Sequence, residues 1–355
     1  MPAALALALY VSACAPPSAY SGGFRPRQGP APSPSPAELA RRAVDRKLAE
    51  TFAPVIFHAT SVSERPASWD TPARVDFDGD LIASNNEESL RAGLHPITPA
   101  VYYAVIETET HAFLTYGLFH PIDWSTMPAV FPYSWHENDM ENIQIVVDKQ
   151  KNSIVLLAAQ AHLGTSLYTI PGSGISSGTV EISDRPIRLL AGGRAAIFVE
   201  SGGHGIYSLS DAPDGELQKT PKSNAPALRE GFVFLSLNAD STGLPGAVPY
   251  ELLSIYDTFW TPYLNGSGLG DGKLMDGTFS YYERGMAWDH IPRHFDSDRL
   301  SGPCKSDAGI LPFAFGFALT DHDLGSLFFH PAEKYAENLA ISRPWSTHYL
   351  RHPYR

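Results

Sequence analysis

The pattern of apolar and polar positions changes its period near residue 52. Before that point, Ser35 precedes a helical pattern and Glu38 follows it three residues later, which is the arrangement of a capping box. The pattern predicts a helix over residues 36–50. We expect the helix to turn inward the apolar side chains Leu39, Ala43 and Leu48.

Beyond residue 52, short runs of β-branched and aromatic residues alternate with Gly, Pro, Asn and Asp. Such spacing predicts strands, which we place at Val101–Glu107, Ala112–Phe119, Ile143–Val147, Ser153–Leu157, Thr179–Ser183, Ala195–Glu200 and Phe232–Leu237. The third and fourth runs flank a turn at residues 148–152 and predict a hairpin. After about residue 245 the pattern becomes irregular. The sequence therefore predicts a mostly β protein, an antiparallel β-sandwich with long irregular loops and one N-terminal helix.

Composition supports this fold class and narrows the partners. The 355 residues include 29 Gly and 30 Pro, with 11% aromatic and 43% hydrophobic residues, which favours strands and turns in a packed core. The formal net charge of −12 excludes a general nucleic-acid-binding protein. It allows an acidic pocket that collects cations. The two cysteines, Cys14 and Cys304, exclude a disulfide scaffold.

The first fourteen residues indicate an export signal. Residues 3–13 form an apolar run that ends at Val11-Ser12-Ala13-Cys14, which resembles a bacterial lipobox. This predicts a signal peptide over residues 1–14, with Cys14 as the lipidation site and the membrane as a partner. Because Ala15 follows the cysteine, an outer-membrane lipoprotein is favoured, and an extracellular protein is the alternative. An ordinary cleaved signal or a chance apolar start would also fit, since no Lys or Arg precedes the run.

The rest of the chain divides into a tether and a body. Residues 15–35 are rich in Pro, Ser and Gly and cannot bury enough apolar surface to fold, so they predict an extended tether. No similar segment interrupts the chain after residue 35. We therefore expect one elaborated β-sandwich domain over residues 36–355.

The strongest chemical signal lies at the entry of a predicted strand. His136, Asp139 and Glu141 form an HxxDxE pattern, in which the two carboxylates are two residues apart and share one face of the strand. Carboxylates this close repel unless a cation or a proton lies between them. Oxygen ligands with one imidazole suit Mg²⁺, Ca²⁺ or Mn²⁺. A solvated strand edge is the alternative.

Two further segments supply residues for the same site. Asp123 follows a strand in the segment Phe119–Trp124, and His204 lies among glycines after another strand. The glycines permit tight turns around an imidazole. A histidine at the end of a third strand, His162, could face the same cleft.

A second acidic group is a candidate for another cation. Asp76, Asp78 and Asp80 alternate around Gly79, a pattern by which calcium loops place oxygens around one point. The glutamate that closes an EF-hand is not at the required spacing. A plain Asp/Gly turn is the alternative.

Over residues 52–210 these motifs resemble the necrosis-inducing (Nep1-like) cytolysins. Asp123, His136, Asp139, Glu141 and His204 follow the order of that family's motifs, which implies a divalent cation in an acidic cleft of a β-sandwich. The opening 52–58, FAPVIFH, is similar to the start of the Vps62-like proteins. The sequence departs from the cytolysins at 135–138, which reads WHEN where they carry basic residues.

These observations leave three functions open. The first is cation-dependent binding of a glycan or a lipid head group by an exported, lipid-anchored protein, as the cytolysin resemblance implies. The second is a metal-dependent hydrolase, in which the cation activates water and His204 or His162 acts as general base. In the third, the carboxylates hold only a structural ion. The sequence does not decide whether the protein is an enzyme.

Overall fold

The computed structural model describes most of the chain between residues 33 and 354. The described residues are 33–60, 67–80, 86–124, 136–162, 164–212, 231–239, 244–261, 279–282, 291–295, 312, 315–317 and 325–354. The predicted signal peptide, Cys14, nearly all of the predicted tether and Cys304 lie outside them. No helix in the described part of the chain combines the length and apolar character needed to cross a membrane.

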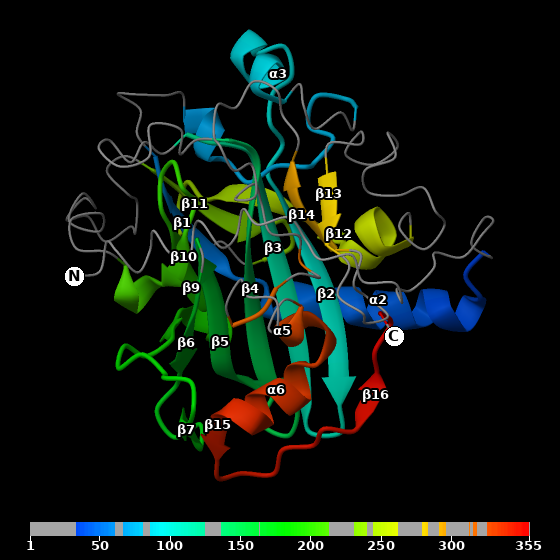
Figure 1. Ribbon diagram of the computed structural model, residues 1–355, viewed down its shortest axis with the longest axis vertical. Helices are drawn as coiled ribbons and strands as arrows, with labels where there is room; N and C mark the ends of the chain where they lie inside the picture. The colour runs from blue at the N-terminus through cyan, green and yellow to red at the C-terminus, as the bar shows by residue number, and fades with distance from the viewer. Residues whose placement is uncertain are drawn as a thin grey trace.

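A twelve-stranded mixed sheet forms the body of the protein (Figure 1). Ten strands follow one another in the order β10-β9-β1-β11-β12-β2-β3-β4-β5-β6, with β8 paired to β9 and β16 to β2. Their bounds are β1 Val55–Ala59, β2 Ala100–Thr108, β3 His111–Asp123, β4 His136–Asp148, β5 Ser153–Ala161, β6 Gly164–Thr169, β8 Arg188–Leu189, β9 Ala195–Val199, β10 Ile206–Ser208, β11 Gly231–Ser236, β12 Val248–Ser254 and β16 Tyr349–Arg351. Two small sheets pair β7 (Ile175–Ser177) with β15 (Leu339–Ile341) and β13 (Phe279–Tyr282) with β14 (Ile291–Phe295).

The mostly β class is confirmed, but the antiparallel sandwich is wrong. Three neighbouring pairs are parallel, β1 with β9, β11 with β12, and β12 with β2. The sheet curls into a half-barrel: β10 lies beside β5, although the two strands are separated in the strand order. Every residue of β1 and of β9 is buried, as expected of strands that are covered on both faces.

Most of the predicted strands are confirmed, including the hairpin of β4 and β5. The run at 179–183 is an exception, because it contains no strand and bonds through its backbone to Leu167 and Asn338. The irregular segment after residue 245 contains the strand β12 and a π-helix at Tyr256–Trp260.

The predicted N-terminal helix is confirmed as α2 (Pro36–Phe52), with the Ser35 hydroxyl accepting a hydrogen bond from the Glu38 amide at 3.1 Å. Its predicted inner face is only partly right. Leu39 is 53% exposed, and α2 instead buries Ala49 and Phe52. The helix is joined to the body by ion pairs, such as that of Arg351 with Asp45.

Two apolar cores lie on opposite faces of the sheet. One contains Ala49 and Phe52 of α2 and the side chains of β4 at 143, 145 and 147. The other contains α5 (Ser326–Phe329) and α6 (Pro331–Asn338), which cross the front of the sheet in Figure 1. Since side chains alternate along a strand, Asp139 and Glu141 share the face of the first core. The candidate site therefore lies at one end of this core.

Candidate metal centre

The entry of β4 places the two predicted carboxylates side by side. Asp139 lies opposite His120 of β3, and Glu141 lies opposite Leu118. Residues directly opposite in an antiparallel pair project to the same face. Asp139 and Glu141 are each only 4% exposed. The predicted same-face pairing is confirmed, but the pair is buried rather than at a solvated edge.

The loop between β9 and β10 brings His204 to Asp139. Gly202 has φ = 85° and His204 itself has φ = 52°, so the loop turns tightly, as its glycines predict. The His204 Nδ1 atom lies 2.6 Å from Asp139 Oδ2, and its Nε2 atom lies 3.2 Å from Asp70 Oδ1. The structure therefore unites two of the predicted residues and adds Asp70.

Asp70 accepts hydrogen bonds from three residues of the site. It ends a short 3-10 helix, Ala67–Asp70, and is fully buried. Its Oδ1 atom also accepts hydrogen bonds from Trp124 Nε1 at 2.9 Å and from the Gly202 amide at 2.8 Å. These bonds fix Asp70 and, through it, the ring of His204.

Glu141 lies in a strongly negative environment. Its Oε1 atom accepts a hydrogen bond from the His162 amide at 2.8 Å, whereas its Oε2 atom is buried and has no hydrogen-bond partner among the described residues. Burial raises the pKa of Glu141 well above its usual value, and the charges of Asp139, Asp123 and Glu200 raise it further. We call these four carboxylates, with His162, the acidic cluster.

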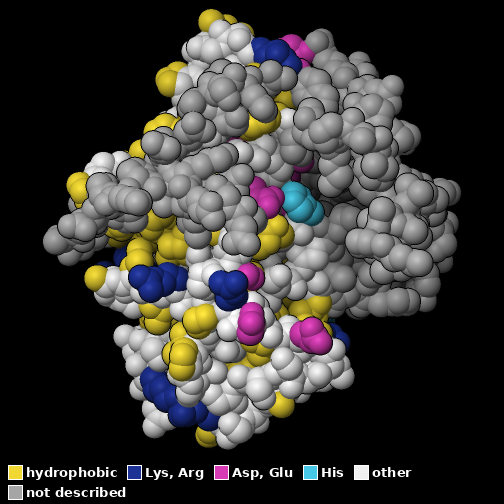
Figure 2. Space-filling view, turned by 90° about the vertical axis from the view of Figure 1, so that its left-hand side faces the viewer, with side chains coloured by type: hydrophobic (Ala, Val, Ile, Leu, Met, Phe, Trp, Pro, Cys, Tyr) yellow, Lys and Arg dark blue, Asp and Glu magenta, His cyan; other side chains and the backbone are white. Residues whose placement is uncertain are grey.

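The rim of the acidic cluster reaches solvent. The side chains of His162 and Glu200 are 47% and 24% exposed, and His162 Nε2 lies 3.1 Å from Glu200 Oε2. The hydrogen bond to Glu200 raises the pKa of His162. A Cβ atom on Gly205 would lie 2.9 Å from Glu200 Oε2, so glycine permits this close approach. Figure 2 shows a histidine beside carboxylates at the molecular surface.

Behind the acidic cluster lies a second group of imidazoles. His58 at the end of β1, His120 on β3 and His204 are all fully buried. Burial lowers the pKa of His58 to about 4 and that of His120 well below its usual value, so both rings are neutral. Burial opposes a charge on His204 as well, but its hydrogen bonds to Asp139 and Asp70 outweigh this and raise its pKa to about 10. His204 is therefore an imidazolium at neutral pH.

The remaining predicted ligands have different outcomes. Asp123 is 7% exposed and close enough to raise the pKa of Glu141 through its charge. The backbone of His136 pairs with Asp123 across β3 and β4. The structure describes only the backbone of His136, so its role as a ligand stays a prediction.

The second predicted cation site forms a turn. Arg74 bonds both oxygens of Asp76, at 2.9 and 3.1 Å, which offsets the charge of that carboxylate. The Asp80 amide donates to Asp78 Oδ1 at 3.3 Å, and Gly79 has φ = 97°. These contacts are those of an Asp/Gly turn, and cation binding here stays a prediction.

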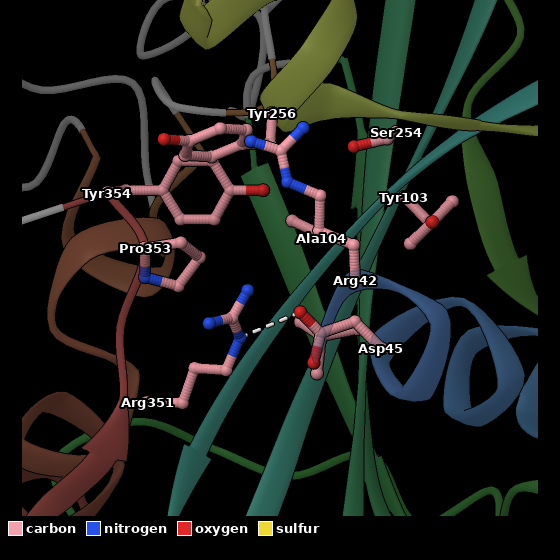
Figure 3. Close-up of a pocket in the computed structure, with 10 residues that line it drawn as sticks. Arg42, Asp45, Tyr103, Ala104, Ser254, Tyr256, Arg351, Pro353 and Tyr354 are labelled. Atoms are coloured by element: carbon pink, nitrogen blue, oxygen red, sulfur yellow. Dashed lines mark hydrogen bonds and ion pairs between the residues drawn. The ribbon is translucent and has the colours of Figure 1, made fainter. Parts of the chain in front are cut away.

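A surface pocket elsewhere is less suited to a ligand. Arg42 and Arg351 point into it (Figure 3). Each guanidinium is already paired, Arg42 with Asp257 at 2.6 Å and Arg351 with Asp45 at 2.7 Å. The first pair joins α2 to the π-helix at Tyr256–Trp260 and the second joins α2 to β16, so we assign the pocket a structural role.

Sequence reasoning missed Asp70 and Glu200 as parts of the site. Glu200 carries a visible signal, because it is a charged residue that ends the apolar run of β9 directly before the glycine loop. Asp70 carries no such sequence signal, since its segment shows no periodicity and its hydrogen-bond partners lie 54 or more positions away in the sequence.

No family model and no curated protein matches the chain. Several solved structures resemble part of it. A structure titled "Toxin fold for microbial attack and plant defense" has a TM-score of 0.30 and 20% identity, over 53% of this chain and 76% of that one. The structure "NLPPya in complex with glucosamine" has a TM-score of 0.30 and 19% identity, over 52% and 74%.

A third structure is the Necrosis and Ethylene inducing Protein 2 from the causal agent of cocoa's Witches Broom disease, with a TM-score of 0.26 and 14% identity, over 55% and 78%. The chain thus has structural neighbours among the necrosis-inducing toxin folds, at low TM-scores and over part of its length.

Proposed function

We propose that this chain is a divalent-cation-dependent binding protein that uses the acidic cluster to hold Mg²⁺, Ca²⁺ or Mn²⁺ and, through it, a glycan or a lipid head group. The observation that carries the proposal is Glu141 Oε2, a buried carboxylate oxygen that lies among like charges and has no hydrogen-bond partner in the described part of the chain. A buried carboxylate is costly unless it is paired, protonated or bound to a metal ion. A cation would bond this oxygen and offset the repulsion.

The donor set favours a hard cation. Asp123, Asp139 and Glu141 offer oxygens, which Mg²⁺, Ca²⁺ and Mn²⁺ prefer. His204 is already bonded to Asp139, so it orients that carboxylate rather than adding to the oxygens.

The rim supports binding of a hydroxyl-rich ligand. A cation held by a few protein oxygens keeps coordination positions for hydroxyl or phosphate oxygens of a ligand. His162 and Glu200 lie next to it and are partly exposed, so they can donate to and accept from a sugar hydroxyl.

A metal-dependent hydrolase is a second candidate, favoured by one observation. His162 lies at the rim in a hydrogen bond with Glu200, and the raised pKa of His162 suits a proton donor near neutral pH. The same shift leaves less of His162 in the unprotonated form that a general base requires. Turnover of a ligand that binds in a cation-dependent manner would establish this reading.

We further propose that the protein is exported and anchored through Cys14, with residues 15–35 as a tether. The support comes from the sequence alone: an apolar run ending in a lipobox-like tetrapeptide, followed by a proline-rich segment. An acylated cysteine would hold the cation site near a membrane surface.

Calorimetric titration with Mg²⁺, Ca²⁺ and Mn²⁺ tests the cation site in wild type, in Glu141→Gln and in Glu181→Gln, a matched control at an exposed glutamate. We expect one site in wild type and in Glu181→Gln, and little binding by Glu141→Gln. Equal binding by all three proteins would refute the proposal.

Pull-down with vesicles then tests the ligand, with and without chelator. Phosphatidylcholine vesicles with an added glycolipid and vesicles with an added anionic phospholipid separate sugar from phosphate recognition. If the protein binds the cation but is retained by neither kind of vesicle and binds no soluble sugar, the ion has only a structural role and the proposed binding function is wrong.

A further inference from the structure

The buried imidazoles form a compact group that the acidic cluster does not use. One ligand-capable atom from each of His58, His120 and His204 lies within 4.8 Å of the others. The three residues come from β1, from β3 and from the loop after β9, and each is fully buried. Burying three polar rings from distant segments is costly unless their nitrogens have partners, which a bound ligand would supply.

The hydrogen bonds show where the protons lie on His58 and His120. His58 Nδ1 lies 2.8 Å from the Ala59 carbonyl oxygen, which can only accept, so Nδ1 carries the proton and Nε2 carries a lone pair. His58 Nε2 lies 3.0 Å from His120 Nε2, which therefore donates. His120 Nδ1 then carries a buried lone pair, for which the described residues supply no hydrogen-bond partner.

Two carboxylates enclose the third imidazole. His204 bonds Asp139 through Nδ1 and Asp70 through Nε2. Asp70 Oδ2 is buried and has no hydrogen-bond partner within the described ranges, although Oδ1 accepts three bonds. Two buried carboxylates therefore hold the two nitrogens of one buried imidazole.

We propose that His58, His120 and His204, supported by Asp70, form a second metal centre for a nitrogen-preferring ion such as Zn²⁺. Zinc takes imidazole nitrogens and carboxylate oxygens in closed, four-coordinate structural sites. Binding through Nε2 of His120 requires the proton of that ring to move to Nδ1. The Asp139 bond to Nδ1 and the Ala59 carbonyl bond orient the rings, as such partners do in metal sites.

The ring geometry sets one requirement for binding. His120 and His204 are stacked, with centroids 3.7 Å apart and planes 11° from parallel. Ligand lone pairs lie in the ring plane, so one ring must tilt out of the stack to reach a shared ion. His58 and His120 need less movement, because two bonds of about 2.1 Å at a tetrahedral angle separate the nitrogens by about 3.4 Å.

Cobalt titration of the metal-stripped full chain tests this centre. Tetrahedral Co²⁺ with nitrogen ligands gives intense visible bands, which octahedral oxygen sites do not. We expect these bands at one Co²⁺ per wild-type chain, their loss on adding equimolar Zn²⁺, and one Zn per chain by elemental analysis of zinc-loaded protein.

Two variants and two controls separate this centre from the acidic cluster. His58→Gln and Asp70→Asn should lose the bands or bind Co²⁺ at least about tenfold more weakly. His111→Gln should bind like wild type, because His111 is a buried histidine of the same sheet outside the group. Glu141→Gln should also keep the bands, since it alters only the acidic cluster. The tests are therefore independent: the histidine centre can be refuted while the cation site of the acidic cluster is confirmed, and the cation site can be refuted while the histidine centre is confirmed.

Wild-type protein with no tetrahedral Co²⁺ bands would overturn the proposal, as would equal affinity of His58→Gln and His111→Gln. If His58→Gln does not fold, NMR of the wild-type histidine rings decides. Zinc should then shift the ring signals of three histidines and leave His111 unchanged. A spectrum that Zn²⁺ does not change would show that the imidazoles form only a hydrogen-bonded network.

Discussion

Replacing Glu141 by Gln should change stability in opposite directions with and without a cation. Gln keeps an oxygen for the His162 amide bond but removes a buried charge from the neighbourhood of Asp139, Asp123 and Glu200. Two like charges about 6 Å apart, at an effective dielectric constant of about 20, repel by about 3 kcal/mol. Part of this cost is already reduced by protonation or by the amide bond, so we expect metal-free Glu141→Gln to be about 1–2 kcal/mol more stable than wild type.

The cation should reverse that order. A ligand present at one hundred times its dissociation constant stabilises the folded state by about 2.7 kcal/mol. Wild type gains this energy and Glu141→Gln does not. In a chain of this size each kcal/mol shifts the melting temperature by about 2–4 °C.

Differential scanning calorimetry in chelator and in excess Ca²⁺, Mg²⁺ or Mn²⁺ measures both effects, with Glu181→Gln as the control for loss of one exposed charge. In chelator, Glu141→Gln should melt a few degrees above wild type. In excess cation, wild type should melt above Glu141→Gln. Parallel shifts of all three proteins would show that the carboxylates do not share an ion, and the reasoning from charge repulsion would be wrong.

Three further predictions concern single residues. Burial lowers the pKa of His111 to about 4, so between pH 6.5 and 4 the unfolded chain binds a proton at this residue that the folded chain does not. The free energy of unfolding should therefore fall by up to about 3 kcal/mol from this group as the pH falls through that range. Urea denaturation across the range should show a smaller loss of stability in His111→Gln. Gly205→Ala places a methyl group against Glu200 Oε2 and should lower the pKa of His162 towards its ordinary value, which NMR titration of the ring measures. An unchanged pKa would mean that the hydrogen bond between His162 and Glu200 re-forms around the methyl group. Cys14→Ala should convert a membrane-bound protein into a released one in its own host, because firm anchoring needs the acyl chains; a wild-type protein that already fractionates as released would contradict lipidation.

Local features of this fold are well predicted from the sequence. The capping pattern at Ser35 places the start of α2, and alternation places β4, β5 and their hairpin. These features depend on contacts between residues close in sequence. The run at 179–183 has a strand-like composition but makes isolated backbone bonds, to Leu167 and Asn338, in place of a strand, so composition alone misleads there.

Non-local features are not predicted. Two of the three parallel pairs, β1 with β9 and β12 with β2, join strands that are far apart along the chain. Their trace in the sequence is the uninterrupted apolar run, for example in β9. Leu39 is exposed because α2 docks largely through ion pairs, which an apolar pattern does not describe.

The candidate site divides in the same way. Asp139 and Glu141 are predicted to be neighbours because a strand fixes their relation. His204 joins Asp139 as its motif suggests. Asp70 and the contact of His58 with His120 depend on how loops and distant strands meet, and no local pattern encodes that.

Anomalous diffraction from crystals of the full chain grown with Mn²⁺ tests the cation site most directly. The account predicts an anomalous peak about 2.0–2.6 Å from Glu141 Oε2, with Asp139 or Asp123 as a further ligand. Mn²⁺ bound elsewhere, with a water or a proton on Glu141 Oε2 and no peak in the acidic cluster, would contradict it.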